Sequence, residues 1–536
     1  MSLASISLRR IGASIAFVLT VALAACSPSN QGGVYLNRGN GGEPKSLDPH
    51  FIDGQWESNI VGDLLIGLVT EDAAGQPIPG AATSWKVSPD GKTWTFHMRK
   101  HVWSDGVPVT SQDFAFAWRR LLDPKTAAPY AYNMWVVKNA KAITDGKLPP
   151  SALGIETPDD ATFIVHLEHP AAYLPQLLMH QTAYPIPRHM YLKLGNDWSR
   201  QENYVSNGAY VVKSWIPNDH VTLAKNPRFY DAAHVRIPTV SYFDTSDSQA
   251  ALLAFRGRQI DQQNPYPSLA IDWMKANIPN DIRSVPYLAI DYIAFNFDRK
   301  PFQDVRLRKA INLAYNREAT VYKVRRIGET PAYNMMPPGV ANYPNGARLN
   351  FEKMSYPARI AEARSLMQQM GYGAHHRLSI VFATSTNPDQ RRAGAILQQM
   401  LSQIYIDTII STEELQVHYS RIQEHDFDIA NAAWIGDFSD ATNFLDLLRA
   451  HSDNNYGLYA NPAYDALLDK AQQTTDLKAR GELLQQAEQI ALDDYAWLPC
   501  YFLVTEDIVQ PYVKGWIPNL RGFNRSRWLW IDGRPQ

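Results

Sequence analysis

The segment from Phe427 to Leu445 contains the side chains best placed to do chemistry. Ile429 to Trp434 is predicted to form a buried strand, and Gly436 lets the chain turn out of it. Asp437 then lies at the carboxyl end of this strand, where α/β sheets bind ligands. A carboxylate beside the ring of Trp434 could hold a cation. The alternative is that Asp437 caps the next helix, and the residues alone leave both open.

Catalytic motifs are missing from the sequence. It contains no H-E-x-x-H, G-x-S-x-G, C-x-x-C, Walker or G-x-G-x-x-G pattern. The pair His375-His376 is interpreted as a surface pair rather than a metal site, because adjacent side chains diverge. We therefore expect no enzyme activity, no catalytic residues, no metal and no cofactor. An exported hydrolase stays the alternative from another class of protein.

The amino-terminal segment indicates that the protein is exported. A short apolar run behind Arg9 and Arg10 ends in Leu23-Ala24-Ala25-Cys26, which resembles the lipobox of bacterial lipoproteins, in which Cys26 would carry the acyl chains. Alternatively, Ala22-Leu23-Ala24 is an ordinary A-x-A cleavage site that would release a chain beginning at Ala25. Both interpretations make residues 1–25 a signal peptide, followed by a flexible tether over residues 26–33. Both place the mature protein outside the cytoplasmic membrane. We expect it in the periplasm, with a lipid anchor on Cys26 as its membrane contact at most.

Composition excludes several classes of protein. The full chain has a net charge of −2, and loss of the two signal arginines makes it more acidic, which argues against nucleic acid as a partner. Its 536 residues are too many for one hydrophobic core, so at least two lobes are expected. The two cysteines, Cys26 and Cys500, provide no disulfide framework. Trp and Tyr are numerous, 14 and 27, and suit a pocket that buries varied side chains.

The coarse pattern is a mixture of strands and amphipathic helices. Thr93 to Met98 alternates as a half-buried strand and is predicted to pair with Ser84 to Val87 through the turn Asp90-Gly91. A strand is predicted over 378–383. Helices are predicted from Ser111 and over 305–316, 358–370, 391–404 and 464–473. This order predicts an α/β fold whose open sheet binds ligands at its crevices.

From about Gly42 to Trp530, the chain also resembles the extracytoplasmic oligopeptide-binding proteins of ABC importers, solute-binding protein family 5, which includes murein-peptide-binding relatives. The segments that carry the resemblance follow one another in the family's order: residues 43–50 (EPKSLDPH), 93–100 (TWTFHMRK), 103–114 (WSDGVPVTSQDF), 207–210 (NGAY), 301–308 (PFQDVRLR) and 433–437 (AWIGD).

The resemblance implies a two-lobed periplasmic-binding-protein fold of the large peptide-binding type. Lobe I would combine residues 34–65, 190–288 and 505–536, with an inserted region, 66–189, packed on it; lobe II would be residues 289–504. The implied function is an extracytoplasmic receptor that captures oligopeptides by lobe closure and delivers them to an ABC permease in the cytoplasmic membrane. We expect a monomer.

The resemblance also implies site residues. Asp437 matches the carboxylate that grips the ammonium group at the peptide's amino terminus, and Ala433 and Trp434 match the strand that pairs with the peptide backbone. Asp53 matches an acidic residue near the peptide on the opposite lobe. Arg325 matches a basic position that contacts the peptide's carboxylate.

The sequence departs from the family at the other end of the ligand. Asn431 replaces an arginine that binds the peptide's carboxyl terminus, and Gln390 falls near a histidine used similarly. Leu415 aligns with a pocket tryptophan, and Ala289 and Ile435 stand where some members carry a disulfide. A different peptide length, a murein peptide, haem or another non-standard solute is therefore open as the ligand.

Overall fold

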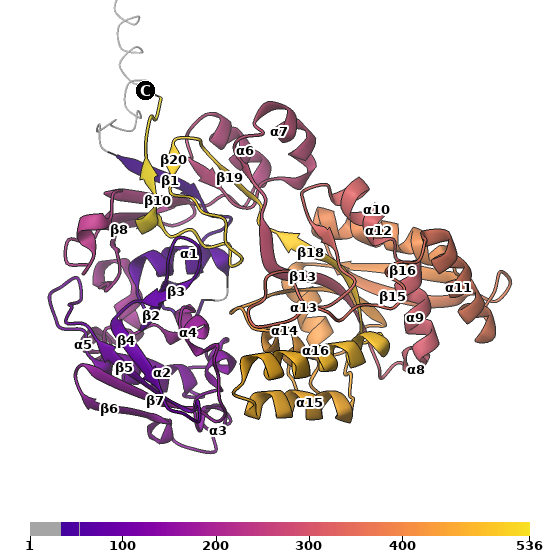
Figure 1. Cartoon of the computed structure of the whole chain (residues 1–536). Coiled ribbons are helices and arrows are strands. Elements are labelled where there is room, and N and C mark those ends of the chain that lie inside the picture. Colours follow the sequence, from indigo (N-terminus) through magenta and orange to yellow (C-terminus); the bar gives the residue numbers. More distant parts are fainter. Residues whose placement is uncertain (1–33, 53, 536) are drawn as a thin grey trace, which may run out of the picture. The chain divides into compact units, whose positions relative to one another are not determined.

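The structure is a computed structural model that describes residues 34–52 and 54–535 (Figure 1). Cys26, the signal peptide, the tether and Asp53 lie outside the described residues. The described chain is built on three sheets of four or more strands, with helices packed against them. It has the predicted mixed α/β character. No helix in this part of the chain is long and apolar enough to cross a membrane.

A seven-stranded sheet gathers strands from the beginning, middle and end of the chain, in the order β12-β19-β11-β1-β10-β9-β8. Strand β1 lies at its centre, parallel to β10 and β11, while the outer pairs are antiparallel. The strands are β1 (Tyr35–Gly39), β8 (Tyr210–Ile216), β9 (His220–Lys225), β10 (Thr239–Phe243), β11 (Gln262–Gln263), β12 (Ile282–Arg283) and β19 (Asp507–Val509).

A four-stranded antiparallel sheet shares one hydrophobic core with the seven-stranded sheet. Its order is β4 (Ala82–Val87), β5 (Thr93–Met98), β7 (Thr162–His166) and β6 (Ile155–Asp159). The predicted strand and hairpin are confirmed, and Gly91 takes the left-handed φ of +71° that the turn requires. Helix α2 (Ser111–Leu122) begins with a capping box of Thr110 and Asp113 and packs Phe114 and Trp118 on Phe163.

A six-stranded sheet forms a second core, in the order β14-β18-β13-β17-β15-β16. The pairs β15–β16 and β15–β17 are parallel, and the other pairs are antiparallel. The sheet is therefore mixed rather than the all-parallel sheet of a simple strand-helix-strand repeat. The strands are β13 (Pro286–Phe295), β14 (Thr330–Pro331), β15 (Leu378–Ser385), β16 (Ile406–Glu413), β17 (Ile429–Ile435) and β18 (Trp497–Val504).

Helices surround this second sheet, and the predicted ones are present with shifted ends. Three of them start earlier than predicted because proline, with its fixed φ, is tolerated in the first turn, at Pro357, Pro388 and Pro462. The helices are α9 (Val305–Ala314), α11 (Tyr356–Gln369), α12 (Pro388–Ser402), α13 (Leu415–Gln423), α15 (Pro462–Gln473) and α16 (Leu477–Asp493). Helices α15 and α16 pack side by side (Figure 1).

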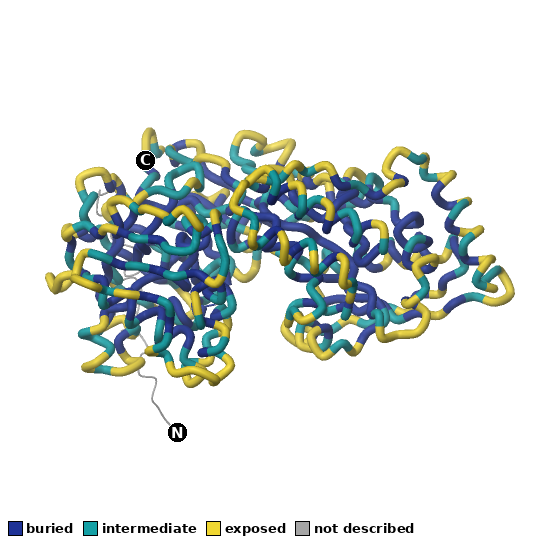
Figure 2. The backbone as a smooth tube through the Cα atoms, turned by 60° about the horizontal axis from the view of Figure 1, so that its bottom comes forward, coloured by how far each residue is buried: buried dark blue, intermediate teal, exposed yellow. Residues whose placement is uncertain are grey.

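Short elements complete the described chain. The small strands are β2 (Val69–Glu71), β3 (Pro77–Pro79), β20 (Val513–Lys514) and β21 (Trp530–Ile531). The other α-helices are α1 (Gln55–Leu64), α3 (Ala140–Thr144), α4 (Leu174–Leu177), α5 (Arg188–Leu194), α6 (Ser248–Arg256), α7 (Ile271–Asn277), α8 (Lys300–Gln303), α10 (Arg317–Ala319) and α14 (Thr442–Leu445). Buried backbone runs through the interior of both halves, and exposed backbone is concentrated in loops and outer helices (Figure 2).

Two short connections carry the chain between the two large sheets. One links β12 to β13 and the other links β18 to β19. They are bonded to each other, because Thr505 N donates to Val285 O at 2.9 Å and Thr505 Oγ1 accepts from Val285 N at 3.4 Å. Two lobes joined by paired crossing strands can rotate about them as a hinge. The lobe boundaries implied by the resemblance stay a prediction.

Candidate functional site

Asp437 follows β17 and leaves the strand through Gly436, as predicted. It does not cap a helix: α14 begins five residues later, and there Asp440 accepts hydrogen bonds from the backbone N and the hydroxyl of Thr442. Asn443 fixes the local geometry, since its Oδ1 accepts from Asp437 N at 3.2 Å and from Trp434 Nε1 at 2.9 Å. Asp437 and Trp434, which the sequence placed beside each other, are thus held together by one amide.

The carboxylate of Asp437 is nearly buried and poorly paired. Its side chain is 12% exposed, and Oδ1 lies 3.7 Å from His180 Nε2. Oδ2 is buried without a hydrogen-bond partner in the described part of the chain. Asn133 Nδ2 and Arg521 Nη1 are likewise buried donors without partners. These buried polar atoms lack hydrogen-bond partners, and a polar ligand could provide them.

Electrostatics point to a cationic ligand group at this position. Burial raises the pKa of Asp437 to about 6, opposed by Asn443, by the charge of Arg521 and by Asn133. Burial lowers the pKa of His180 to about 3, so this ring is neutral and does not compensate the carboxylate. An ammonium group entering here would form an ion pair with the carboxylate. This ion pair is strongest when water is excluded from it.

Three distant segments surround Asp437. Tyr132, Asn133 and His180 come from the part of the chain that carries the four-stranded sheet, and Arg521 comes from the carboxyl-terminal segment. Sequence reasoning missed all four, because nothing in their local pattern distinguishes them. The site is formed only when both lobes contribute.

Strand β17 offers an open backbone edge next to Asp437. It pairs with β13 along its whole length, from Ile429 to Ile435, but with β15 only at Ile429 and Ala430. From Asn431 onward, that edge has no strand neighbour among the described residues. Side chains of α13 cover it instead: His418 Nε2 lies 2.8 Å from Asn431 O, and Ala433 N donates to the hydroxyl of Tyr419 at 3.4 Å. An extended ligand could take the place of these side chains.

Asn431 lies at the start of this edge and faces an acid. Its Nδ2 donates to both carboxylate oxygens of Asp291 on β13, at 3.1 and 3.2 Å, and Gln390 Nε2 donates to Oδ2 at 3.4 Å. Two positions that depart from the family therefore converge on one buried carboxylate. Asp291 was missed by sequence reasoning, although a lone charge within the apolar run of β13 was a usable signal.

The remaining predicted positions are more scattered. Arg325 is 8% exposed and lies among carboxylates, with Glu329 at 2.6 Å. Leu415 is exposed at the first turn of α13. Ala289 and Ile435 are directly opposite each other on β13 and β17. Cys500 is a buried free cysteine on β18.

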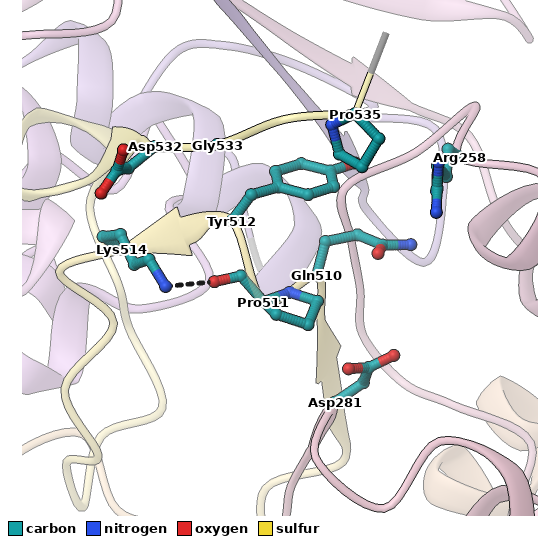
Figure 3. A pocket seen from close by; sticks show the side chains of 9 residues that line it. All are labelled: Arg258, Asp281, Gln510, Pro511, Tyr512, Lys514, Asp532, Gly533 and Pro535. Atoms are coloured by element: carbon teal, nitrogen blue, oxygen red, sulfur yellow. Dashed lines mark hydrogen bonds between the residues drawn. The ribbon is translucent and has the colours of Figure 1, made fainter.

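A cavity of about 460 Å³ opens elsewhere, beside the carboxyl-terminal segment (Figure 3). It is lined by Arg258, Asp281, Gln510, Pro511, Tyr512, Lys514, Asp532, Gly533 and Pro535. Lys514 Nζ already donates to Pro511 O at 2.6 Å, and none of the predicted site residues lines this cavity. The candidate site remains Asp437 and the edge of β17.

Two lobes with paired crossings, and an underpaired carboxylate reached by side chains of both, define a ligand-binding protein that closes on its ligand. The sequence profile of the bacterial extracellular solute-binding proteins, family 5 (middle), matches residues 76–456, and the chain belongs to this family.

Characterised relatives match over nearly the whole chain. The periplasmic oligopeptide-binding protein OppA of Salmonella typhimurium is 36% identical over 520 residues, which cover 94% of this chain and 95% of that protein. Among solved structures, Haemophilus influenzae OppA in complex with RPPGFSPFR superposes with a TM-score of 0.82 at 34% identity, covering 93% of this chain and 99% of that one. The murein tripeptide binding protein MppA of Escherichia coli superposes with a TM-score of 0.84 at 30% identity, covering 93% and 98%.

Proposed function

We propose that this protein is an extracytoplasmic receptor that binds oligopeptides between its two lobes and delivers them to an ABC permease. The observation that carries the proposal is the nearly buried, underpaired carboxylate of Asp437 beside the open edge of β17. Relatives that bind oligopeptides or a murein tripeptide support peptide as the ligand class. Asp437 holds the ligand's ammonium group.

Recognition of the rest of the peptide uses the backbone. The edge at Ala433 and Trp434 offers main-chain donors and acceptors to an extended ligand, and such pairing does not depend on ligand side chains. Asp53 contributes from the opposite lobe, and Asn431 and Arg325 border the other end of the ligand. The ligand contacts both lobes only when they are closed, so binding shifts the population toward closure.

The proposal also includes where the protein is located and that it does not convert its ligand. The mature protein works in the periplasm, as the names of its relatives state for them, and Cys26 carries a lipid anchor. The protein binds without converting its ligand and acts as a monomer. Intact mass of the mature amino terminus tests the anchor: acyl chains on Cys26 support it, and a chain beginning at Ala25 contradicts it.

A pair of peptides tests the binding proposal. Asp437→Asn is expected to weaken binding of a free-amine peptide by on the order of 100-fold or more, because breaking a buried ion pair costs about 3–5 kcal/mol. The same peptide with an acetylated amino terminus is expected to bind wild type and variant equally weakly in calorimetry.

Asp469→Asn is the matched control, since Asp469 is 69% exposed and forms an ion pair with Arg449. Equal losses for free and acetylated peptides would remove Asp437 as the ammonium partner. A peptide recovered shortened after incubation with the protein would favour a hydrolase.

A further inference from the structure

Asp291 is the charged group beneath the far end of the β17 edge. It is 3% exposed, and its hydrogen bonds to Asn431 and Gln390 come from neutral amides. Neither amide supplies positive charge. The carboxylate therefore keeps its negative charge uncompensated by its direct partners, in a region where burial makes charges act strongly on one another.

Arg325 is the cation whose charge acts on Asp291, and carboxylates already surround it. Its Nε lies 2.6 Å from Glu329, its Nη1 3.4 Å from Asp389 and its Nη2 3.9 Å from Glu506. Each guanidinium nitrogen thus already faces an acid.

The charged side chains around Asp291 and Arg325 carry more negative than positive charges. The cations are Arg325 and Arg392, and the latter is paired with Asp389. The carboxylates are Asp291, Glu329, Asp389 and Glu506. With two cations against four carboxylates, the group, called here the acid cluster, is negative when fully ionised.

The acid cluster lies within reach of a peptide bound at Asp437. Asn431 and Asp437 are six residues apart, which corresponds to at most about 20 Å of extended chain. A peptide that starts at Asp437 and follows the edge back to Asn431 therefore brings its other end to the acid cluster within about six residues.

We propose that the acid cluster makes the β17 edge select against a free carboxylate at the far end of its ligand and favour an end that donates hydrogen bonds, either an amide or a cationic group. This inference rests on the proposed function and specifies its ligand class. A ligand carboxylate would meet Asp291 as a like charge, whereas an amide or ammonium group would meet an acceptor.

The titration of the cluster is consistent with its excess of acid. Burial raises the pKa of Asp291 to about 6, opposed by the amide of Asn431 and by Arg325. Burial also raises the pKa of Glu506 to about 8, where Arg325 opposes the shift and Glu329 and Asp389 add to it. A cationic ligand end would supply the charge that these carboxylates lack.

Calorimetry with a peptide series tests the inference. Oligoalanines of three to six residues, all with free amino termini, are prepared as the free acid, the carboxyl-terminal amide and the 2-aminoethylamide. At the length that binds best, the amide is expected to bind at least about tenfold more tightly than the acid. The 2-aminoethylamide is expected to bind at least as tightly as the amide.

Variants that remove a charge show which carboxylate causes the preference for the amide over the acid. Asp291→Asn is expected to reduce the ratio of amide to acid affinity to less than about threefold. Glu506→Gln provides a second variant at a less buried position. It is expected to reduce the ratio in the same direction but by less near neutral pH, because the raised pKa of Glu506, about 8, leaves this group largely protonated there. Asp407→Asn is the matched control, because Asp407 is 59% exposed on β16 and pairs with Arg377.

The outcomes separate this inference from the proposed function. Free acids that bind as tightly as amides, with binding still dependent on Asp437, would overturn the inference alone. A preference for amides that persists unchanged in both Asp291→Asn and Glu506→Gln would also overturn it. No binding by any member of the series would overturn both the inference and the proposed function.

Discussion

The ring of Tyr173 stacks on the ring of Phe438, with centroids 4.8 Å apart and planes inclined by 10°. Tyr173 precedes α4, in the chain region that carries the four-stranded sheet, and Phe438 directly follows Asp437. Next to this stack, Ser439 N donates to Gln176 Oε1 at 2.9 Å. These contacts join the two lobes at the residue proposed to bind the ligand, so closure and ligand binding are coupled at one place.

Tyr173→Ala is expected to weaken peptide binding by about tenfold, because an aromatic pair contributes about 0.5–1.5 kcal/mol beyond its buried area. The closed state loses this contact while the ligand's own contacts remain. Calorimetry measures the change, and Tyr372→Ala is the control, since Tyr372 stacks on His376 at an exposed turn. Unchanged affinity in Tyr173→Ala would show that the stack does not stabilise the closed state.

Binding of free-amine peptides is expected to weaken as the pH falls through 6. The raised pKa of Asp437, about 6, means that the empty site takes up a proton below this pH. This proton must leave before an ammonium group binds, so affinity falls by up to about tenfold per pH unit below 6. Above pH 6 it levels off, until the peptide's own α-amino group begins to lose its proton at about pH 8. His180 stays neutral over this range because its pKa is lowered to about 3.

Calorimetry from pH 5 to 8 with an amidated peptide checks this dependence. Asp437→Asn serves as the control, since it removes the titrating group and leaves the contribution of Asp291, whose pKa is also about 6. A wild-type profile that falls no more steeply below pH 6 than that of Asp437→Asn would contradict the assignment of Asp437 as the titrating group.

Local sequence patterns predicted the helices and strands, whereas the set of residues around Asp437 could be recognised only from the folded structure. The strand at Thr93–Met98 and the helix from Ser111 follow from alternation and capping, which depend on neighbours in sequence. The position of Asp437 after β17 was predicted for the same reason. Its neighbours Tyr132, His180 and Arg521 were not, because they come from other segments of the chain and no local periodicity records such contacts.

The departures from the family were visible in the sequence, but their meaning was not. Asn431 and Gln390 each read as the loss of a basic residue. Only the fold shows that both amides face Asp291, Asn431 from β17 and Gln390 from α12. Likewise, Arg325 matched a basic position, but two of the three carboxylates around it, Asp389 in α12 and Glu506 just before β19, come from segments distant in sequence.

Tyr419→Phe is expected to strengthen peptide binding by a few-fold. The hydroxyl of Tyr419 accepts the hydrogen bond of Ala433 N at 3.4 Å, on the edge where a ligand carbonyl would accept it instead. Removal of the hydroxyl removes a competitor, and a net hydrogen bond contributes about 0.5–1.5 kcal/mol. Calorimetry with an oligoalanine measures the effect. A loss of affinity would show that the hydroxyl contacts the ligand.

Asp440→Asn is expected to lower the free energy of unfolding by about 3–5 kcal/mol, because it leaves the guanidinium of Arg480 buried without a charge partner. The two side chains are 2% and 5% exposed, and the pair is bidentate at 2.7 and 2.8 Å. Urea unfolding measures the change. The control is Glu482→Gln, whose exposed pair with Lys478 at 4.0 Å is expected to contribute less than about 1 kcal/mol. Equal stabilities of the two variants would show that the Asp440–Arg480 pair does not stabilise the lobe that presents Asp437.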